Sequence, residues 1–360
     1  MCGIVGAASP RNVVPVLIEG IRRLEYRGYD STGLAVLNGA AGTALTRLVS
    51  TARVADLDAQ AVERKIVGTT GISHTRWATH GAPSTVNAHP HVSADEIAVV
   101  HNGIIENFEA LRERLRAQGY AFNTQTDSET IAHLVHAHWH GAAKGDLVRA
   151  VQLAVAEFEG AYAIAVISSR EPGRVVGARQ GSPLVVGIGA DDHFLASDAA
   201  ALVPVTRRVV YLEEGDVADV RTESYAIYDT SGQRAERVAV DVPDSAAAVE
   251  LGPYRHFMQK EIFEQPQALT STWQGHLDGD EIKVEARGKE AIRTMLTSYF
   301  KGLPSARSEI ESISTLGPWV SVRERAHWTG KSGPKSQAAL SVYEVRDGLL
   351  RRVWYYPSVK

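Results

Sequence analysis

The chain opens with Met1-Cys2-Gly3-Ile4-Val5-Gly6, and the predicted fold is organised around this hexapeptide. Cys2 is the only cysteine in 360 residues, and removal of Met1 would make it the N-terminal residue. Such a residue combines a thiol with an α-amine whose ordinary pKa of about 7.7–8.0 lets it act as a base near neutral pH. The apolar pair Ile4-Val5 between glycines predicts a buried strand. The hexapeptide alone is equally compatible with an incidental cysteine beside a retained Met1.

Composition restricts the class of protein. A chain of 360 residues with 44% hydrophobic residues predicts two or three domains with substantial cores. A net charge of −4 offers no basic surface for nucleic acid, and one cysteine excludes an intramolecular disulfide or a multi-thiolate metal site. Arg11 interrupts the short apolar N-terminus, and no apolar run reaches the roughly 18 residues of a membrane span. We therefore expect a cytoplasmic protein without nucleic-acid or membrane partners.

The order of the predicted elements indicates an α+β fold. Apolar residues at helical spacing predict a helix over 14–24. A strand over 97–101 is predicted to run into a loop at Asn102-Gly103, and three helices follow. Thr126 with Glu129 has the pattern of a capping box at the start of the second of these helices. Short strands come next, and strands, helices and strands in turn predict a layered domain with two sheets.

Two domains and a connector are predicted. The first domain covers 2–240, a linker and connector cover 241–283, and a small α+β unit covers 284–360. In that last unit a helix near 292–299 precedes four strand candidates, the last two joined by a turn at Asp347-Gly348.

Three polar features are predicted to lie in loops just after strands, where side chains can converge. Arg76 offers a planar fork for a carboxylate, and Trp77 beside it could cover a small ligand. The Asn102 amide and the Gly103 N–H can supply two donors to a developing oxyanion. Asp127 can pair with a substrate ammonium. Together with a thiol, this set suits a free amino acid with a side-chain carbonyl, and glutamine fits.

Each feature also has an ordinary structural explanation. Arg76 could be a surface salt-bridge partner and Trp77 a core residue. Asn102-Gly103 is a common turn dipeptide, and Asp127 could cap the helix that follows it. The hypothesis of a site therefore rests on the occurrence of all of them in one chain.

Six blocks carry a resemblance to a known family. They are Cys2-Gly3-Ile4-Val5-Gly6, 24–31 (LEYRGYDS), 74–81 (HTRWATHG), 87–91 (NAHPH), 101–107 (HNGIIEN) and Thr126-Asp127. In this order they resemble the class II glutamine amidotransferase domain, most closely that of the glutamine–fructose-6-phosphate aminotransferase family. The segment 254–266 (YRHFMQKEIFEQP) is similar to that family's connector, and the resemblance covers about residues 2–270. It implies an N-terminal-nucleophile fold, an αββα four-layer sandwich.

The resemblance implies the catalytic roles. Cys2 would be the nucleophile after removal of Met1, with its own α-amine as the general base. Asn102 and Gly103 would form the oxyanion hole. The reaction would be thiol attack on the carboxamide of L-glutamine, release of ammonia and hydrolysis of the thioester, within amino sugar biosynthesis.

The resemblance also implies the binding residues. Arg76 would hold the α-carboxylate of glutamine, Asp127 its α-amine, and Trp77 would gate the site. Supporting residues from neighbouring loops would be Thr79 and His80 beside the substrate, Arg27 and Gly28 beside the nucleophile, and His89 in a mobile loop.

The tail differs from the family. From about residue 284 it resembles instead a SnoaL-like or nuclear-transport-factor-2-like domain, a partial cone-shaped barrel without an evident opening helix. A tail that merely packs, a ligand pocket and a dimerisation module all remain open. The sugar-isomerase half is not recognisable, so ammonia could pass to a separate acceptor subunit or to a fructose-6-phosphate-binding partner. A non-catalytic glutamine-sensing module and an amidotransferase for another acceptor are the alternatives, and a homodimer remains open.

A histidine-rich stretch invites a metal site. His133, His136 and His140 share a predicted helical face, but the sequence places no acidic or thiol ligand nearby. A solvated face is therefore favoured. Because no phosphate-binding or dinucleotide-binding motif is present either, we expect no metal and no cofactor.

Overall fold

The computed structural model describes residues 2–27, 29–38, 44–77, 81–242, 277–278, 281–282, 307–316, 319–330, 333–346 and 349–357. The chain divides into two compact units, Met1–Lys260 and Glu261–Lys360, each described by itself. Most of the connector lies outside the described residues, so the predicted boundaries at 240 and 283 stay predictions.

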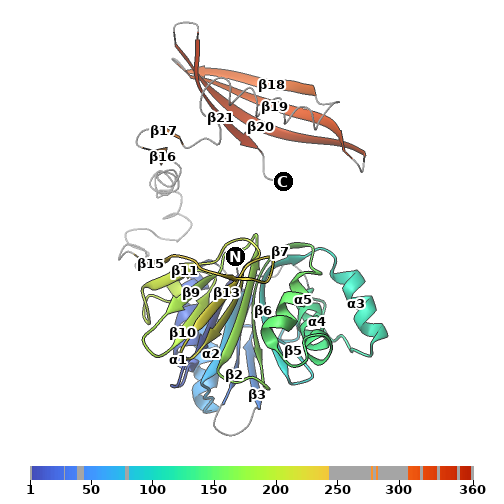
Figure 1. Ribbon diagram of the computed structural model, residues 1–360, viewed down its shortest axis with the longest axis vertical. Helices are drawn as coiled ribbons and strands as arrows, with labels where there is room; N and C mark the ends of the chain where they lie inside the picture. Colours follow the sequence, from blue (N-terminus) through green and yellow to red (C-terminus); the bar gives the residue numbers. More distant parts are fainter. Residues whose placement is uncertain are drawn as a thin grey trace. The chain divides into compact units, whose positions relative to one another are not determined.

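Two antiparallel sheets form the middle of the N-terminal unit (Figure 1). The first contains β1 (Gly3–Ala8), β2 (Ser31–Leu37), β3 (Leu45–Ser50), β4 (Thr70–Arg76), β9 (Val185–Ile188), β10 (His193–Ala196), β11 (Arg208–Tyr211) and β15 (Ala239–Asp241). The second contains β5 (His91–Ser93), β6 (Ile97–Ile105), β7 (Gly160–Ser168), β8 (Arg174–Gln180), β12 (Val217–Arg221), β13 (Tyr225–Tyr228) and β14 (Arg234–Ala235). Their strand orders are β15-β11-β9-β10-β1-β4-β2-β3 and β14-β13-β12-β8-β7-β6-β5, so β1 lies inside its sheet and β6 near an edge.

Helices cover the outer face of each sheet. The first sheet carries α1 (Val14–Leu24), the short 3₁₀ helices η1 (Glu25–Arg27) and η2 (Ala199–Ala201), and α2 (Val54–Glu63). The second carries α3 (Phe108–Ala117), α4 (Ser128–His140) and α5 (Leu147–Val155). The two helical layers stand on opposite sides of the sheets in Figure 1. This is the αββα four-layer sandwich that the family resemblance implies, and it has the two sheets that the order of elements predicts.

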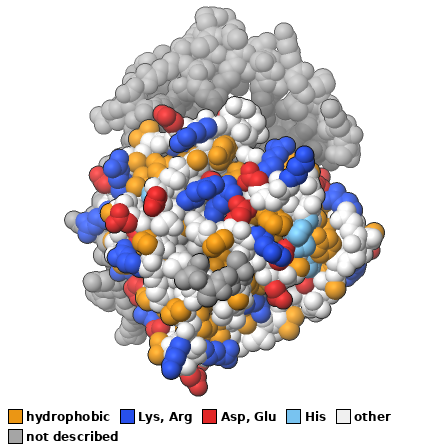
Figure 2. All heavy atoms as spheres, turned by 60° about the horizontal axis from the view of Figure 1, so that its bottom comes forward, with side chains coloured by type: hydrophobic (Ala, Val, Ile, Leu, Met, Phe, Trp, Pro, Cys, Tyr) orange, Lys and Arg blue, Asp and Glu red, His pale blue; other side chains and the backbone are white. Residues whose placement is uncertain are grey.

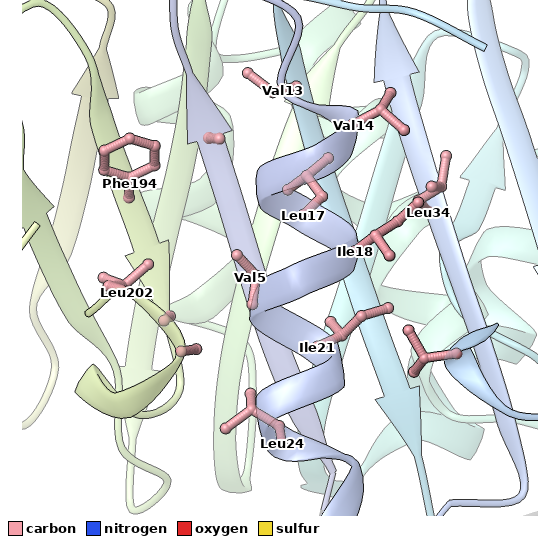
Figure 3. Packing of buried hydrophobic residues seen from close by; sticks show 14 of the residues in the cluster. Val5, Val13, Val14, Leu17, Ile18, Ile21, Leu24, Leu34, Phe194 and Leu202 are labelled. Carbon is pink, nitrogen blue, oxygen red and sulfur yellow. The ribbon is translucent and has the colours of Figure 1, made fainter. Parts of the chain in front are cut away.

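Alternating side chains of β1 build two of the three cores. Val5 packs against Leu17 and Ile21 of α1, as Figure 3 shows. Its neighbour Ile4 points the other way, into the layer between the sheets, together with Val100 of β6 and other strand residues. All of these side chains are buried, and a third core lies between α3–α5 and the second sheet. β1 is therefore held from both faces, which fixes the position of the residue before it.

The predicted helix over 14–24 is confirmed, and two local predictions are wrong. Asn102-Gly103 is not a loop, because β6 continues through both residues to Ile105 and pairs with β7 along its whole length. Thr126 and Glu129 form no capping box. The Glu129 carboxylate instead accepts hydrogen bonds from the backbone N–H groups of residues 123 and 124.

The C-terminal unit contains a four-stranded antiparallel sheet in the order β18-β19-β20-β21. Its strands are β18 (Arg307–Leu316), β19 (Trp319–Gly330), β20 (Gly333–Arg346) and β21 (Leu349–Pro357), preceded by the two-residue strands β16 (Leu277–Asp278) and β17 (Glu281–Ile282). The four predicted strands are confirmed, whereas the helix predicted near 292–299 lies outside the described residues. Among the described residues of the whole chain, no helix has the length and apolar character of a membrane span.

Candidate active site

The strand register places Cys2 beside the end of β4. Gly3 pairs with Thr75, so the residue before β1 lies next to the residues that end β4. The backbone N–H of Trp77 donates to Cys2 Sγ at 3.2 Å. A Cβ on Gly3 would stand 2.7 Å from both Leu24 Cδ1 and Thr75 Oγ1, so only glycine allows α1 and β4 to approach β1 this closely.

The surroundings of Cys2 favour a protonated thiol. Burial raises its pKa above the ordinary value, and this exceeds the opposing effects of the Trp77 N–H and the Arg76 charge. A thiolate is the reactive form of cysteine. Cys2 therefore needs a nearby base to become a nucleophile near neutral pH.

The Asn102 amide is held in one orientation beside Cys2. Its Nδ2 donates to the Cys2 carbonyl oxygen at 3.3 Å, while its Oδ1 lies 3.0 Å from His74 Nε2. His74 Nε2 also lies 3.0 Å from the carbonyl oxygen of His101, which can only accept, so Nε2 carries the proton. Burial, as the main cause, lowers the pKa of His74 to about 3, so the ring is neutral near pH 7. An amide nitrogen has two protons, and the contact with Cys2 uses only one.

Gly103 follows Asn102 in β6 with a backbone conformation that requires glycine. Its φ is +125°, and a Cβ would stand 2.0 Å from the carbonyl oxygen of Ala161 on the neighbouring strand β7. Gly103 directly follows Asn102 in the chain and is exposed. The two groups predicted as an oxyanion hole are thus adjacent on one strand.

Arg76 and Trp77 differ from their ordinary explanations. Arg76 is 3% exposed, so it is not a surface residue, and its guanidinium lies 3.5 Å from the Asp30 carboxylate. It also donates to the carbonyl oxygens of Gly81 (3.2 Å) and Ala82 (3.5 Å). Trp77 is 55% exposed, so it is not a core residue. Arg76 is thus a buried ion-pair partner and Trp77 a surface residue.

Asp127 is buried and does not cap α4 through its side chain. Its Oδ2 accepts a hydrogen bond from the backbone N–H of Ile105 at 2.9 Å and lies 3.8 Å from His101 Nδ1. Ile105 ends β6, the strand that also carries Asn102. One strand therefore positions both the Asn102 amide beside Cys2 and the Asp127 carboxylate.

Four buried histidines lie close to these residues, namely His74, His89, His91 and His101. The ring centroids of His74 and His89 are 4.2 Å apart, and those of His89 and His91 are 4.6 Å apart. His89 Nε2 and His101 Nδ1 both lie 2.9 Å from the hydroxyl of Ser128. Burial is the main cause that lowers the pKa of His89 and His91 well below the ordinary value. His89 thus packs against His74, which in turn contacts the Asn102 amide.

The remaining predicted residues are only partly described. Thr79, His80 and Gly28 lie outside the described residues, and Arg27 is described only as the backbone end of η1. Sequence reasoning gave no role to His74 or Asp30. The spacing of His74 and Arg76 was a usable signal, because residues two apart on a strand share a face.

One expectation about the histidine-rich helix is wrong. The expectation that no acidic residue lies nearby is wrong, because Glu96 Oε2 lies 2.6 Å from His140 Nε2 and 3.5 Å from His136 Nε2. His133 does not join them. Its Nδ1 contacts the Ser93 hydroxyl at 2.8 Å, and its Nε2 contacts a backbone carbonyl at 3.1 Å.

Comparison with known proteins shows which families this chain is similar to. Residues 74–204 match the glutamine amidotransferase domain family, and residues 265–353 match the SnoaL-like domain family. A glutamine–fructose-6-phosphate aminotransferase (isomerizing) of Bordetella pertussis is 53% identical over 333 residues, which cover 88% of this chain and 53% of that protein. The protein of the same name from Pseudomonas aeruginosa is 48% identical, over 89% of this chain and 54% of its own length. The chain thus spans about half the length of the curated relatives that it matches.

A solved structure shares the fold. Glutamine phosphoribosylpyrophosphate amidotransferase from B. subtilis, complexed with ADP and GMP, superposes with a TM-score of 0.55 at 23% identity. The superposition covers 65% of this chain and 50% of that one. The fold is therefore that of the N-terminal-nucleophile amidotransferases. The chain carries a glutamine amidotransferase domain of the glutamine–fructose-6-phosphate aminotransferase family, with a SnoaL-like domain after it.

Proposed function

We propose that this chain hydrolyses L-glutamine to glutamate and ammonia through a thioester on Cys2. The observation that carries the proposal is the placement of Cys2 between the Trp77 N–H and an Asn102 amide with fixed orientation. A thiol alone would be incidental, but here the Trp77 N–H contacts Sγ and an amide of fixed orientation contacts the carbonyl oxygen of the same residue, which suits attack on a carboxamide.

The first half of the reaction uses the chain end. After removal of Met1, the α-amine of Cys2 takes the thiol proton, and Sγ attacks the side-chain carbonyl carbon of glutamine. The resulting oxyanion accepts hydrogen bonds from the second Asn102 N–H and the Gly103 N–H. The carbon–nitrogen bond then breaks, the amine returns the proton to the leaving nitrogen, and ammonia departs.

The second half restores the thiol. The same α-amine takes a proton from water, which attacks the thioester carbonyl. The carbon–sulfur bond then breaks to release glutamate, and the amine returns the proton to Sγ. Arg76 would hold the α-carboxylate of the substrate by exchanging its carbonyl partners in the 81–82 segment for the ligand. Asp127 would hold the α-amine, and Trp77 would cover the bound ligand.

The destination of the ammonia is part of the proposal. In this chain a SnoaL-like match follows the amidotransferase domain. We therefore propose that a partner supplies the acceptor, either a separate acceptor subunit or a fructose-6-phosphate-binding chain, and that the protein works in the cytoplasm, where thiols stay reduced. Amino sugar formation would follow if fructose-6-phosphate is that acceptor.

The test is product formation by the purified full chain. We expect glutamate and ammonium in equal amounts from glutamine, and loss of both in Cys2→Ala. Glutamine binding without any product would favour a sensing module over an enzyme. Product formation that survives Cys2→Ala would contradict the proposal. Repeating the assay with fructose-6-phosphate shows whether that sugar alters turnover.

A further inference from the structure

Two histidines and a glutamate converge at the C-terminal half of α4, at the opposite end from Asp127. His136 and His140 are four residues apart on the helix, so their side chains leave the same face. Glu96 comes from the turn between β5 and β6. One ligand atom from each of the three residues lies within 4.8 Å of the other two. Figure 2 shows histidine side chains at the surface of the molecule. The side chain of His140 is 48% exposed and that of Glu96 15%, so solvent ions have access to the cluster.

Two of the three side chains are already oriented by neighbours. His136 Nδ1 lies 2.7 Å from the Tyr120 hydroxyl, which leaves Nε2 directed at Glu96. Arg170 holds Glu96 Oε1 through its Nε at 2.9 Å and through its Nη2, which leaves Oε2 to the histidines. A partner on the second ring nitrogen is the usual feature of a metal-binding histidine, because it fixes both ring orientation and tautomer.

The spacing fits a small tetrahedral ion. Zinc bonds of about 2.0–2.1 Å place neighbouring ligand atoms about 3.3 Å apart. His136 Nε2 and Glu96 Oε2 are 3.5 Å apart, close to this value. His140 Nε2 and Glu96 Oε2 are 2.6 Å apart and must separate by less than about 1 Å. The His140 side chain is 48% exposed, so its ring has room to move.

We propose that Glu96, His136 and His140 form a binding site for Zn²⁺ or a similar borderline divalent cation, with water as the fourth ligand. Two imidazoles and a carboxylate favour such ions over Mg²⁺ and Ca²⁺, which prefer oxygen ligands alone. The ion takes the place of the hydrogen bond between His140 and Glu96. It joins α4 to the β5–β6 turn.

The position of the site gives it a structural role. Asp127 immediately precedes α4 and Asn102 lies on β6, so an ion that joins α4 to the turn before β6 links the elements that position both residues. The ion touches neither of them. We therefore expect it to raise the stability of the domain without taking part in the reaction, since a ligand that binds only the folded state stabilises it.

The experiment measures Zn²⁺ binding by calorimetry to the untagged, chelator-treated full chain. The Cys2→Ser background removes the thiol as a competing ligand. We expect one Zn²⁺ per chain with a Kd of micromolar order, because the Arg170 charge weakens the site. His140→Gln and Glu96→Gln should each weaken binding at least about tenfold, as expected when one of three ligands is lost. His138→Gln is the matched control, since His138 is on the same helix but contacts Glu157 at 2.7 Å.

A second measurement identifies the ligands. X-ray absorption at the zinc edge should show two imidazoles and oxygen ligands in the Cys2→Ser chain, and added Zn²⁺ should raise its Tm but not that of the His140→Gln variant. Absence of binding at about 100 µM Zn²⁺, far above the affinity expected for such a site, would overturn the proposal. Equal affinities in His140→Gln and His138→Gln would overturn it too.

Discussion

His74 Nε2 lies 3.0 Å from Asn102 Oδ1 and decides which way the Asn102 amide points. The same Nε2 faces the His101 carbonyl oxygen, so it must donate, and Asn102 must present its oxygen to it. The amide nitrogen is then left facing Cys2. A buried neutral histidine thus positions a group that would stabilise the oxyanion, without touching the substrate itself.

Replacing His74 should lower kcat more than it changes KM for glutamine. In His74→Ala the Asn102 amide loses the contact that fixes it, and we expect kcat to fall by about 10–10²-fold, below the roughly 10²–10³-fold loss of a whole oxyanion donor. Steady-state kinetics check this. His74→Gln, whose side-chain amide can donate at the same place, should recover part of kcat. Equal kcat values for wild type and His74→Ala would exclude the positioning role.

A side chain at Gly103 should destabilise the domain. Gly103→Ala brings a Cβ to 2.0 Å from the Ala161 carbonyl oxygen. Gly119→Ala is the matched control, because Gly119 also has a positive φ of +93° but has nothing within 4 Å of the added Cβ. We expect about 1 kcal/mol of lost unfolding free energy at Gly119 and at least about 2 kcal/mol more at Gly103, measured by urea unfolding. Similar losses of unfolding free energy in the two variants would mean that β7 shifts to make room for the added methyl group.

Removing the charge of Asp127 should weaken substrate binding. In Asp127→Asn the side-chain oxygen can still accept from the Ile105 N–H, so the fold is retained while the ammonium loses its counter-charge. We expect KM for glutamine to rise about 10–100-fold, in line with a hydrogen bond to a charged group, with a small change in kcat. Asp146→Asn, the same change at the exposed N-cap of α5, serves as the control. An unchanged KM in Asp127→Asn would remove this residue from the substrate site.

The buried histidines should make the domain acid-sensitive. Burial lowers the pKa of His74 to about 3 and that of His91 well below its ordinary value of 6.5. Between pH 6.5 and about 3 the unfolded chain binds protons that the folded chain does not, so stability falls as pH falls through this window, by up to about 1.4 kcal/mol per pH unit for each histidine. Above pH 6.5 these histidines do not change the free energy of unfolding as pH varies.

Unfolding free energy measured from pH 7.5 to 5 checks this sign. In His91→Asn the free energy of unfolding should depend less steeply on pH than in the wild type, by about one bound proton. A flat profile in the wild type, or equal slopes in the two proteins, would mean that the buried histidines are protonated in the folded state.

Strong local patterns made much of the fold predictable. The helix at 14–24 and the strand at Ile4-Val5 follow from apolar spacing, and the two cores on either side of β1 confirm both. β3 and α2 between residues 45 and 63 were not predicted, because a half-exposed strand and a short, weakly apolar helix leave little periodic signal.

Long-range contacts limit how much of the site can be predicted from the sequence. Asn102-Gly103 looks like a turn in sequence, and only pairing with β7, about sixty residues later, makes it part of a strand. Glu129 has a capping-box spacing, yet its carboxylate binds backbone groups that precede the helix. Glu96 is forty residues from His136, so no local pattern connects them. Residue types predicted the chemistry, but tertiary contacts decided the partners.

The base proposed for the reaction is the α-amine of Cys2, and a removable leader peptide shows whether the reaction needs this amine to be free. The chain is produced with a peptide in front of Cys2 and is then cleaved immediately before this residue, and glutamate release is measured before and after cleavage. We expect no turnover with the leader attached and full turnover once the amine is free. Equal turnover in both states would contradict it.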